Sequence, residues 1–451
     1  YYPKIDRASF AILTELDRRA DVRVRDDFGN FGRPTLTSIA SRERIDALTG
    51  LSFEDEFLSR AEALRGGRPE ITWAMVRIDL GHMRVFNEWY GNAVGDRLIA
   101  DIGAALKGFE DAGAGVAGYW GEDDFSLFTP FDGMFIDDLY LKLCSVVYDY
   151  DGAAGFRPSV GIYCLAPNEK VSLDQYTKAL FAAHRAKRRL QNRISMFRPV
   201  EFAKDQAEQE VLVEFKRALS DGRVFFHLQP QCDLATGKIV GAEALARMRR
   251  EDGTFVSPAD FVPVLEKTQL IELLDKHIWR ALFAWQRERM LAGKPLVPVS
   301  LNVSRIDLLS FDVPGYLDTL IAHYGVPASC VSAEITETAC TLQLDDVRDL
   351  ISALDELGIK VYMDDFGSGQ SSLNMLRGVD VDAIKLDRAF LLGGKETAGK
   401  GESIIQSIMD LSRSLDIPVI VEGVETEEQV QMMRRLGAEY AQGFYFYRPM
   451  S

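Results

Sequence analysis

The stretch VRDLISALDELGIKVYMDD, residues 347–365, encodes a helix that is followed directly by a strand. Its apolar residues recur at the i, i+3, i+4 and i+7 positions of an amphipathic helix, at Val347, Leu350, Ile351, Leu354 and Leu357. Gly358 is the residue type that commonly ends a helix, and Ile359–Met363 has the apolar composition of a buried strand. The stretch therefore predicts one helix–strand unit whose strand ends on two aspartates.

The same helix–strand order recurs further along the chain. A second unit has an apolar helical stripe within 404–415 and then the strand Val419–Val421. A third helix opens with Thr426 and Gln429, which have the spacing of a capping box. Repeated units of this kind imply a parallel sheet, and about eight such strands fit into residues 221–451. The predicted fold of this part is α/β, a (βα)8 TIM-like barrel.

Polar residues occupy the ends of the predicted strands. Each carries a charge or an oxygen that can bind a metal: Gln229, Glu243, Asn302, Glu334, Asp364, Asp365, Lys385, Glu422 and Gln442. In such a barrel the strand ends meet at one mouth, where active sites of the fold are found. Converging carboxylates favour divalent cations with oxygen ligands, Mg²⁺ or Mn²⁺. The adjacent Asp364 and Asp365 can reach two ions, which suits in-line displacement at phosphorus.

The composition excludes several classes of function. A formal net charge of −16 argues against broad binding to an anionic membrane or to nucleic acid, so no DNA or RNA partner is expected. The five cysteines have no CxxC spacing and the five histidines form no cluster, which disfavours a zinc site. Scattered thiols, no bilayer-length apolar run and no signal peptide predict a cytoplasmic protein without membrane contact from this segment. Because residue 1 is Tyr, we expect part of a longer protein, and any upstream membrane or sensor region is not in this sequence.

The rest of the chain divides into three segments. Residues 1–45 predict an N-terminal helix and a polar connector, either the tail of a signalling helix or a helix packed on the next domain. Residues 46–198 predict an α+β block that a basic helix, His184–Arg193, closes. Its clearest strands are expected at 72–79, 125–129 and 159–164. Residues 199–220 predict one connecting helix with too few apolar positions for a core helix.

Residues 210–451 resemble the EAL family of cyclic di-GMP phosphodiesterases. The resemblance rests on motifs that occur in order: Gln229-Pro230, Glu243-Ala244-Leu245 with Arg247, Ser300–Ser304, Glu334–Glu337, Asp364–Gly369, Ile384–Asp387, Glu422–Glu425 and Gln442-Gly443. Each motif alone is common, and only the ordered set is specific. The resemblance implies hydrolysis of cyclic di-GMP to linear pGpG with two ions of Mg²⁺ or Mn²⁺ in each EAL site. By analogy with the family it also implies a homodimer.

The resemblance further implies a role for each site residue. The metal ligands would be Glu243, Asn302, Glu334, Asp364, Asp365 and Glu422. The catalytic set would be Lys385, which contacts the attacking water, together with Glu243, Glu337 and Glu422. Glu337 would hold the loop after Asp365, which couples metal binding to dimerisation in the family. Substrate contacts would come from Arg247, on a phosphate, and from Gln229, Asp387, Glu425 and Gln442. In that loop this chain has Ser368 and Gln370 where the family usually has Thr and Tyr, which affects the coupling but removes no metal ligand.

Residues 46–198 resemble a GGDEF domain, the diguanylate cyclase module, with a ferredoxin-like fold of the nucleotide-cyclase type. The resemblance rests on Asp46–Leu51, Asp79, Asn87, Gly95-Asp96, Ser159–Gly161 and Ala186-Lys187. The signature itself is degenerate, since it reads GEDDF at Gly121–Phe125. Glu122 brings a negative side chain to the point where backbone would approach a triphosphate. Cyclase activity is therefore not expected.

Two interpretations of this block remain open. A regulatory GTP site is one, and its candidate residues are Asp79, Asn87, Asp96, Asp123 and Lys187. A silent dimerisation scaffold is the other. For the whole chain, the alternatives to a phosphodiesterase are a receptor that binds cyclic di-GMP without cleaving it and a bifunctional cyclase and phosphodiesterase. Such receptors usually lack a metal carboxylate or the lysine, and this sequence lacks none of them.

Overall fold

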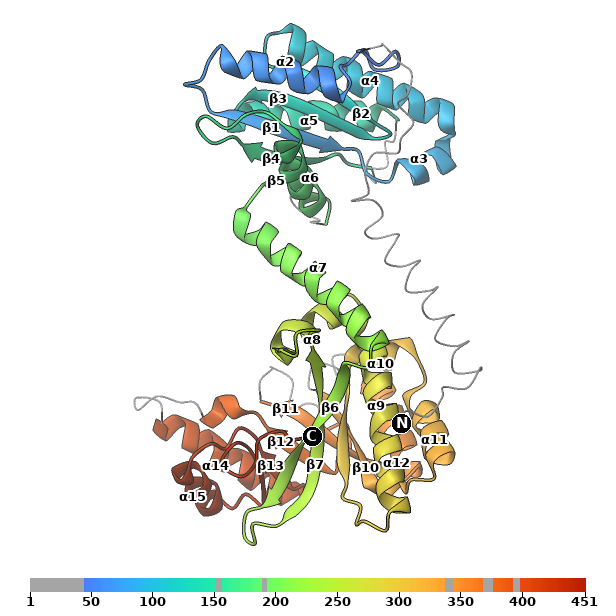
Figure 1. Ribbon diagram of the computed structural model, residues 1–451, viewed down its shortest axis with the longest axis vertical. Coiled ribbons are helices and arrows are strands. Elements are labelled where there is room, and N and C mark those ends of the chain that lie inside the picture. The colour runs from blue at the N-terminus through green and yellow to red at the C-terminus, as the bar shows by residue number, and fades with distance from the viewer. Residues whose placement is uncertain (1–43, 151–155, 189–192, 337–343, 368–375, 392–397) are drawn as a thin grey trace. The chain divides into compact units, whose positions relative to one another are not determined.

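The computed structural model describes residues 44–150, 156–188, 193–336, 344–367, 376–391 and 398–451. The chain divides into two compact units, Tyr1–Ala203 and Lys204–Ser451, each with its own sheet (Figure 1). Within the described residues, no helix is both long enough and apolar enough to cross a membrane. Several sequence predictions lie outside the described residues, namely the helix near the N-terminus, Glu337, Ser368 and Gln370.

The first unit contains a five-stranded sheet with the strand order β2-β3-β1-β4-β5. Its strands are β1 (Trp73–Asp79), β2 (Val116–Gly121), β3 (Asp124–Pro130), β4 (Ser159–Cys164) and β5 (Ile194–Met196). The central β1 is antiparallel to both β3 and β4, whereas β4 and β5 are parallel. The strands predicted at 72–79, 125–129 and 159–164 are thus confirmed as β1, β3 and β4.

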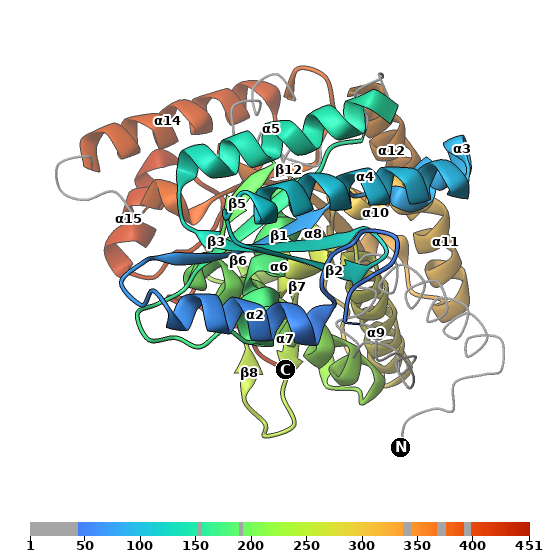
Figure 2. The ribbon, with the colours of Figure 1, turned by 90° about the horizontal axis from the view of Figure 1, so that it is seen from above.

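Helices cover both faces of this sheet. They are α2 (Glu54–Gly66), α3 (Met83–Tyr90), α4 (Asn92–Asp111), α5 (Gly133–Tyr150) and α6 (Leu173–Lys187). Because side chains alternate along β1, Val76 and Ile78 pack with residues of α3, α4 and α5, whereas Trp73 and Met75 pack with residues of α2 and α6. Figure 2 shows α4 and α5 on one side of this sheet and α2 on the other. The predicted bounds of the basic helix, His184–Arg193, are wrong. α6 begins earlier, at Leu173, after the capping box of Ser172, and it ends at Lys187.

One helix, α7 (Pro199–Ser220), spans the division between the units and confirms the helix predicted for these residues. The expectation that it has too few apolar positions for a core helix is wrong at its C-terminal end. Val211, Phe215 and Ala218 recur at helical spacing, and Phe215 and Ala218 are buried in the core of the second unit.

The second unit is a barrel of eight strands. In their order around the ring these are β6 (Val224–Asp233), β14 (Tyr440–Gln442), β13 (Val419–Val421), β12 (Ala383–Leu386), β11 (Lys360–Phe366), β10 (Val331–Thr336), β9 (Val299–Val303) and β7 (Ile239–Arg249). Pairing of β6 with β7 closes the ring, and the short β8 (Phe255–Val256) pairs with β7. The number of strands confirms the prediction. The sheet is not wholly parallel, however, because β6 is antiparallel to β7 and to β14. The connection between β6 and β7 is a tight turn, which joins antiparallel but not parallel strands.

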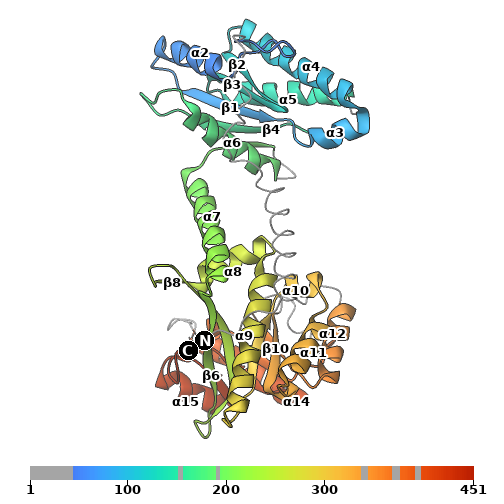
Figure 3. The same ribbon diagram turned by 45° about the vertical axis from the view of Figure 1, so that its right-hand side comes forward.

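Helices line the outside of the ring. They are α8 (Pro258–Lys267), α9 (Ile271–Leu291), α10 (Arg305–Ser310), α11 (Val313–Tyr324), α12 (Leu344–Glu356), α14 (Ala398–Leu415) and α15 (Glu427–Leu436), with the short turns η1 (Ala328–Cys330) and η3 (Arg388–Leu391). α9, α11 and α12 lie side by side (Figure 3). The opening sequence stretch is confirmed: after α12, Gly358 has a φ of +79° and the Ile359 amide donates to the Leu354 carbonyl at 2.9 Å. The chain then enters β11, which carries the two aspartates into the barrel.

Candidate active site

A buried lysine lies among carboxylates inside the barrel. Lys385 is in β12 and its side chain is 1% exposed. Its Nζ atom lies within 4 Å of four acidic side chains: Glu334 Oε2 at 2.6 Å, Glu422 Oε1 at 2.6 Å, Glu243 Oε2 at 3.2 Å and Asp364 Oδ1 at 3.2 Å. These acids come from β10, the end of β13, β7 and β11, so four separate strands contribute to one cluster.

Strand register explains why these residues meet. Asn302 in β9 pairs with Glu334 in β10, and Glu243 in β7 is level with Ser300 in β9. Side chains alternate between the two faces of a strand, so the site residues point into the barrel while their neighbours point outward. Those outward neighbours are buried apolar residues of the core: Ala244, Ile335 and Leu386.

Two amides hold the Glu243 carboxylate. Asn302 Nδ2 donates to its Oε1 at 3.1 Å and Gln442 Nε2 donates to its Oε2 at 2.6 Å. Gln442 also contacts Gln229 Oε1 at 3.4 Å. Gln229 was expected at a strand end; it lies within the antiparallel β6 instead, yet it still faces Glu243 across the β6–β7 pair. Burial acts to raise the pKa of Glu243, but the charge of Lys385 and these hydrogen bonds lower it below its usual value.

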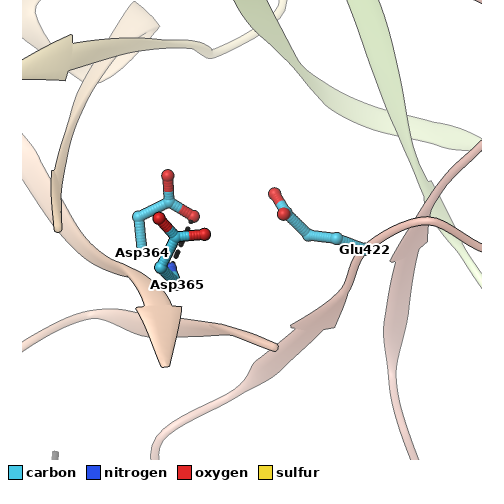
Figure 4. Close-up of side chains that lie close together, drawn as sticks. All are labelled: Asp364, Asp365 and Glu422. Atoms are coloured by element: carbon cyan, nitrogen blue, oxygen red, sulfur yellow. Dashed lines mark hydrogen bonds between the residues drawn. The ribbon is translucent and has the colours of Figure 1, made fainter. Parts of the chain in front are cut away.

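The two adjacent aspartates and Glu422 form a second group of oxygens. One carboxylate oxygen from each of Asp364, Asp365 and Glu422 lies within 4.8 Å of the others (Figure 4). Consecutive residues of a regular strand point to opposite faces. Here β11 shifts register between Met363 and Phe366 and Asp365 has a φ of +55°, so both carboxylates reach the same space. The Asp365 amide donates to Asp364 Oδ1 at 2.9 Å and fixes this turn.

Protonation in this cluster is perturbed by burial and by crowded negative charge. Burial, followed by the charges of Glu243 and Asp364, raises the pKa of Glu334 well above its usual value. Burial raises the pKa of Glu422 to about 7, against the opposing effect of Lys385. Burial and the charge of Asp364 raise the pKa of Asp365 to about 6. The carboxylates of the cluster therefore carry more negative charge than the Lys385 ammonium can neutralise.

The donor atoms fit a divalent cation. Glu334 Oε1 and Gln442 Oε1 are buried in the described structure without a hydrogen-bond partner. A buried polar atom normally has a partner, and a metal ion supplies one. The donors are carboxylate and amide oxygens, which suit Mg²⁺, Mn²⁺ or Ca²⁺ rather than soft metals. Glu243, Asn302, Glu334, Asp364, Asp365 and Glu422 are thus brought together as the sequence predicted, and Lys385 lies among them.

Residues 212–449 match one protein family, described as the EAL domain. This chain belongs to the EAL domain family. It is 27% identical over 423 residues to the cyclic di-GMP phosphodiesterase NbdA of Pseudomonas aeruginosa, which is 92% of this chain and 53% of that protein. It is 25% identical to the bifunctional diguanylate cyclase/cyclic di-GMP phosphodiesterase MucR of the same organism, over 97% of this chain and 65% of that protein.

The fold is also shared with a solved structure. The EAL enzyme Bd1971 in its cGMP-bound form has a TM-score of 0.50 at 24% identity, over 55% of this chain and 68% of that chain. This likeness concerns the fold alone. The chain spans about half the length of the first curated relatives that it matches.

The structure also describes three residues of the EAL domain that were predicted to contact the substrate, Arg247, Asp387 and Glu425. Arg247 is half-buried in β7, four residues after Glu243, and its Nη1 donates to the Ala246 carbonyl at 2.8 Å. It lines an open pocket of about 420 Å³ together with His227, Phe255, Val256, Ser257 and Pro258. Asp387 accepts a hydrogen bond from the Ala389 amide at 2.7 Å, and its charge acts on Asp365. Glu425 is exposed ahead of α15, and its backbone amide donates to Gln429 Oε1 at 2.7 Å.

The first unit brings together part of its predicted site. Lys187 Nζ lies 3.2 Å from Asp79 Oδ1, and burial together with the Asp79 charge raises the pKa of Asp123 to about 6. Asn87 Oδ1 is buried without a partner, whereas Asp96 is exposed. Asp79, Asp123 and Lys187 thus form one cluster, and Asn87 and Asp96 lie on α3 and α4.

Sequence reasoning missed a buried acidic pair in the EAL domain, Asp275 and Asp307. One signal was available. Ser304 and Asp307 have the spacing of a capping box, which would have predicted the start of α10 directly after β9.

Proposed function

We propose that this chain hydrolyses cyclic di-GMP to linear pGpG with two divalent cations, Mg²⁺ or Mn²⁺, at the Lys385 cluster. The observation that carries the proposal is the Lys385 ammonium held by carboxylates from four strands, at the mouth where active sites of this fold occur. Membership of the EAL domain family supports the same reaction, as do the names of NbdA and MucR.

The charge of the cluster supports two ions rather than one. Five carboxylates surround one ammonium, when Asp365 is counted with the four acids that contact Lys385. Four negative charges are then uncompensated when all five are ionised, and two divalent cations carry the matching positive charge. Glu243, Asn302, Glu334 and Asp364 would hold one ion. Asp364, Asp365 and Glu422 would hold the other.

Each residue then has a task in the reaction. The bound ions would supply Lewis acidity and lower the pKa of water, the chemistry known for two-metal sites. Lys385 stays positively charged, since its four carboxylates outweigh the effect of burial and raise its pKa. We infer that it orients the attacking water and stabilises negative charge on the phosphate, while Glu243 and Glu422 hold it in place. Glu337 would hold the loop that follows Asp365.

The substrate would extend from the cluster along β7. Arg247 offers a guanidinium that can bind a phosphate through two parallel hydrogen bonds. This local positive charge matters because the whole chain carries a net charge of −16. Gln229, Asp387, Glu425 and Gln442 would complete the contacts to the dinucleotide.

Product analysis of site variants tests the proposal. We expect the wild type to release pGpG from cyclic di-GMP with Mn²⁺, and Glu243→Ala and Lys385→Ala to release none. The exposed Glu439→Ala should keep wild-type turnover. Full activity in either site variant would overturn the site, and wild type that binds cyclic di-GMP by calorimetry without cleaving it would be a receptor.

We further propose that residues 46–198 form a degenerate GGDEF domain that binds GTP as a regulatory ligand. The cluster of Asp79, Asp123 and Lys187 supports this proposal, with Asn87 and Asp96 as further contacts. Calorimetry with GTP and Mg²⁺ tests it, and no binding at millimolar GTP leaves the silent scaffold. Formation of cyclic di-GMP from GTP would indicate a bifunctional enzyme. The family resemblance also supports a cytoplasmic homodimer, which light scattering would contradict by finding only monomer.

A further inference from the structure

Two acidic side chains face each other beneath the outer helices of the barrel. Asp275 belongs to α9 and is 8% exposed, and Asp307 belongs to α10 and is fully buried. Acidic residues are almost never buried this deeply unless they are paired. This pair therefore requires an explanation that the proposed catalytic cluster does not provide.

The hydrogen bonds of Asp307 reveal what the pair needs. Its Oδ2 accepts from the Ser304 amide at 2.8 Å and from the Ser304 hydroxyl at 2.7 Å. Its Oδ1 is buried without a hydrogen-bond partner among the described residues. The carboxyl group of Asp275 lies close enough to Asp307 for the two groups to act on each other. Two carboxyl groups in contact can form a hydrogen bond when one of them carries a proton.

The surroundings favour that proton. Burial, then the charge of Asp307 and the hydrogen bond to it, raise the pKa of Asp275 well above its usual value. Burial also raises the pKa of Asp307, while its bonds to Asp275 and Ser304 oppose the rise. The other charged groups that act on the pair are acidic too, Glu266 from α8 and Glu272 from α9. The surroundings therefore favour one proton on the pair.

The pair is connected to the candidate metal site through β9. Ser304 follows the last residue of β9, and Asn302 is two residues before it. One turn of α9 beyond Asp275, Trp279 donates from Nε1 to the Asn302 carbonyl at 3.2 Å. Helix α9 therefore holds the end of β9 at two points. Between them, the Asn302 side chain donates to Glu243.

We infer that Asp275 and Asp307 are positioning residues that share one proton, fix the Ser304 turn and thereby hold Asn302 against Glu243. The inference rests on the proposed metal site, since Asn302 and Glu243 are two of its ligands. Neither aspartate is one of the proposed metal ligands or substrate contacts. Partners that orient metal ligands typically change metal affinity or activity by about 10–100-fold when removed.

Three variants of α9 test the inference. Asp275→Ala removes the carboxyl group that acts on Asp307, so we expect Mn²⁺ affinity by calorimetry to fall about 10–100-fold and kcat to fall with it. Asp275→Asn keeps a donor for Asp307, so it should retain wild-type Mn²⁺ affinity. Gln286→Ala is the matched control: Gln286 is fully buried on the same helix, but it holds the Cys330 carbonyl, before β10. It should lower the unfolding midpoint and leave Mn²⁺ affinity unchanged.

A purely structural role predicts a different result. Wild-type Mn²⁺ affinity in Asp275→Ala, with a midpoint lowered as in Gln286→Ala, would overturn the inference. Should Asp275→Ala not fold, the metal-free unfolding of Asp275→Asn decides. A carboxyl group whose pKa is raised by folding stabilises the folded state at pH values below the usual carboxyl range. This stabilisation is lost as pH rises through the pKa of the group in the folded state. The unfolding midpoint of Asp275→Asn should therefore rise relative to that of the wild type as pH increases. A difference between the two midpoints that does not change with pH would refute the shared proton. If the Mn²⁺ affinities of the variants change as expected but no pGpG forms, the proposed function is refuted and the positioning role is not.

Discussion

Lys385 Nζ lies 2.6 Å from Glu334 Oε2, and the two side chains are 1% and 0% exposed. A buried ion pair is weak evidence for stability, because removal of both charges from water offsets much of their attraction. Within the part of the chain that the structure describes, Glu334 Oε1 is buried without a hydrogen-bond partner. A reaction site explains this ion pair better than stability does, because such a site needs a positively charged side chain beside oxygen atoms that are available as metal ligands.

Replacement of Lys385 should destabilise the metal-free protein more than the metal-bound protein. Lys385→Met would leave the buried carboxylates without their counter-charge, which typically lowers the free energy of unfolding by about 3–5 kcal/mol. Divalent ions offer replacement positive charge, so Mn²⁺ should recover much of the loss. Urea unfolding with EDTA and with Mn²⁺ measures both. Lys360→Met, at the exposed start of β11, is the control, and equal losses with and without Mn²⁺ would contradict the account.

Metal affinity should rise with pH. Burial raises the pKa of Asp365 to about 6 and that of Glu422 to about 7 in the metal-free protein. Ligands must lose their protons to bind, so Mn²⁺ affinity should increase between about pH 5 and pH 8 and then level off. In the metal-free protein, the stability due to these raised pKa values is full below the usual carboxyl range and is lost as pH rises through them. The gap between unfolding midpoints with and without Mn²⁺ should therefore widen with pH, and a constant gap would count against the site.

Asp365→Asn should weaken the binding of the second ion without disturbing the backbone. Asparagine tolerates the left-handed conformation that Asp365 adopts, with a φ of +55°, but it brings no charge. We expect a clear loss of Mn²⁺ affinity and turnover, with an unfolding midpoint in EDTA at or above that of the wild type. Asp416 has a φ of +58° in the turn after α14, so Asp416→Asn is a matched control for the backbone. Equal activity in the two variants would remove Asp365 from the site.

Arg247 should act on substrate binding rather than on the metal. Arg247→Lys keeps the charge but loses the planar pair of donors, so we expect KM to rise while Mn²⁺ affinity stays constant. Arg247→Ala should raise KM further. The exposed Arg250→Ala serves as the control for net charge. A wild-type KM in Arg247→Ala would assign the substrate phosphate to another group.

The sequence predicted the convergence of the site because it follows from chain geometry. Glu334, Asp364 and Lys385 end apolar runs, and parallel strands in a barrel bring such ends to one mouth. Local signals were equally reliable for the helix that ends just before Gly358 and for the capping box at Thr426. These features depend on residues a few positions apart, and the structure confirms them.

Features set by distant contacts were not predictable in the same way. The pairing of β6 with β14 joins residues that are more than two hundred positions apart in the chain. The burial of Phe215 depends on the core residues that pack against it, so the small number of apolar positions in its helix did not reveal it. The left-handed backbone at Asp365 and the contact between Asp275 and Asp307 leave no periodic trace in the sequence. Such tertiary effects add detail that the sequence pattern does not contain.

The most direct test of the central claim is the fate of cyclic di-GMP with the purified chain and Mn²⁺, followed by chromatography of the products. The account predicts conversion to pGpG, its arrest by EDTA and its absence in Glu243→Ala. Intact cyclic di-GMP after incubation with folded, Mn²⁺-bound wild type would contradict it.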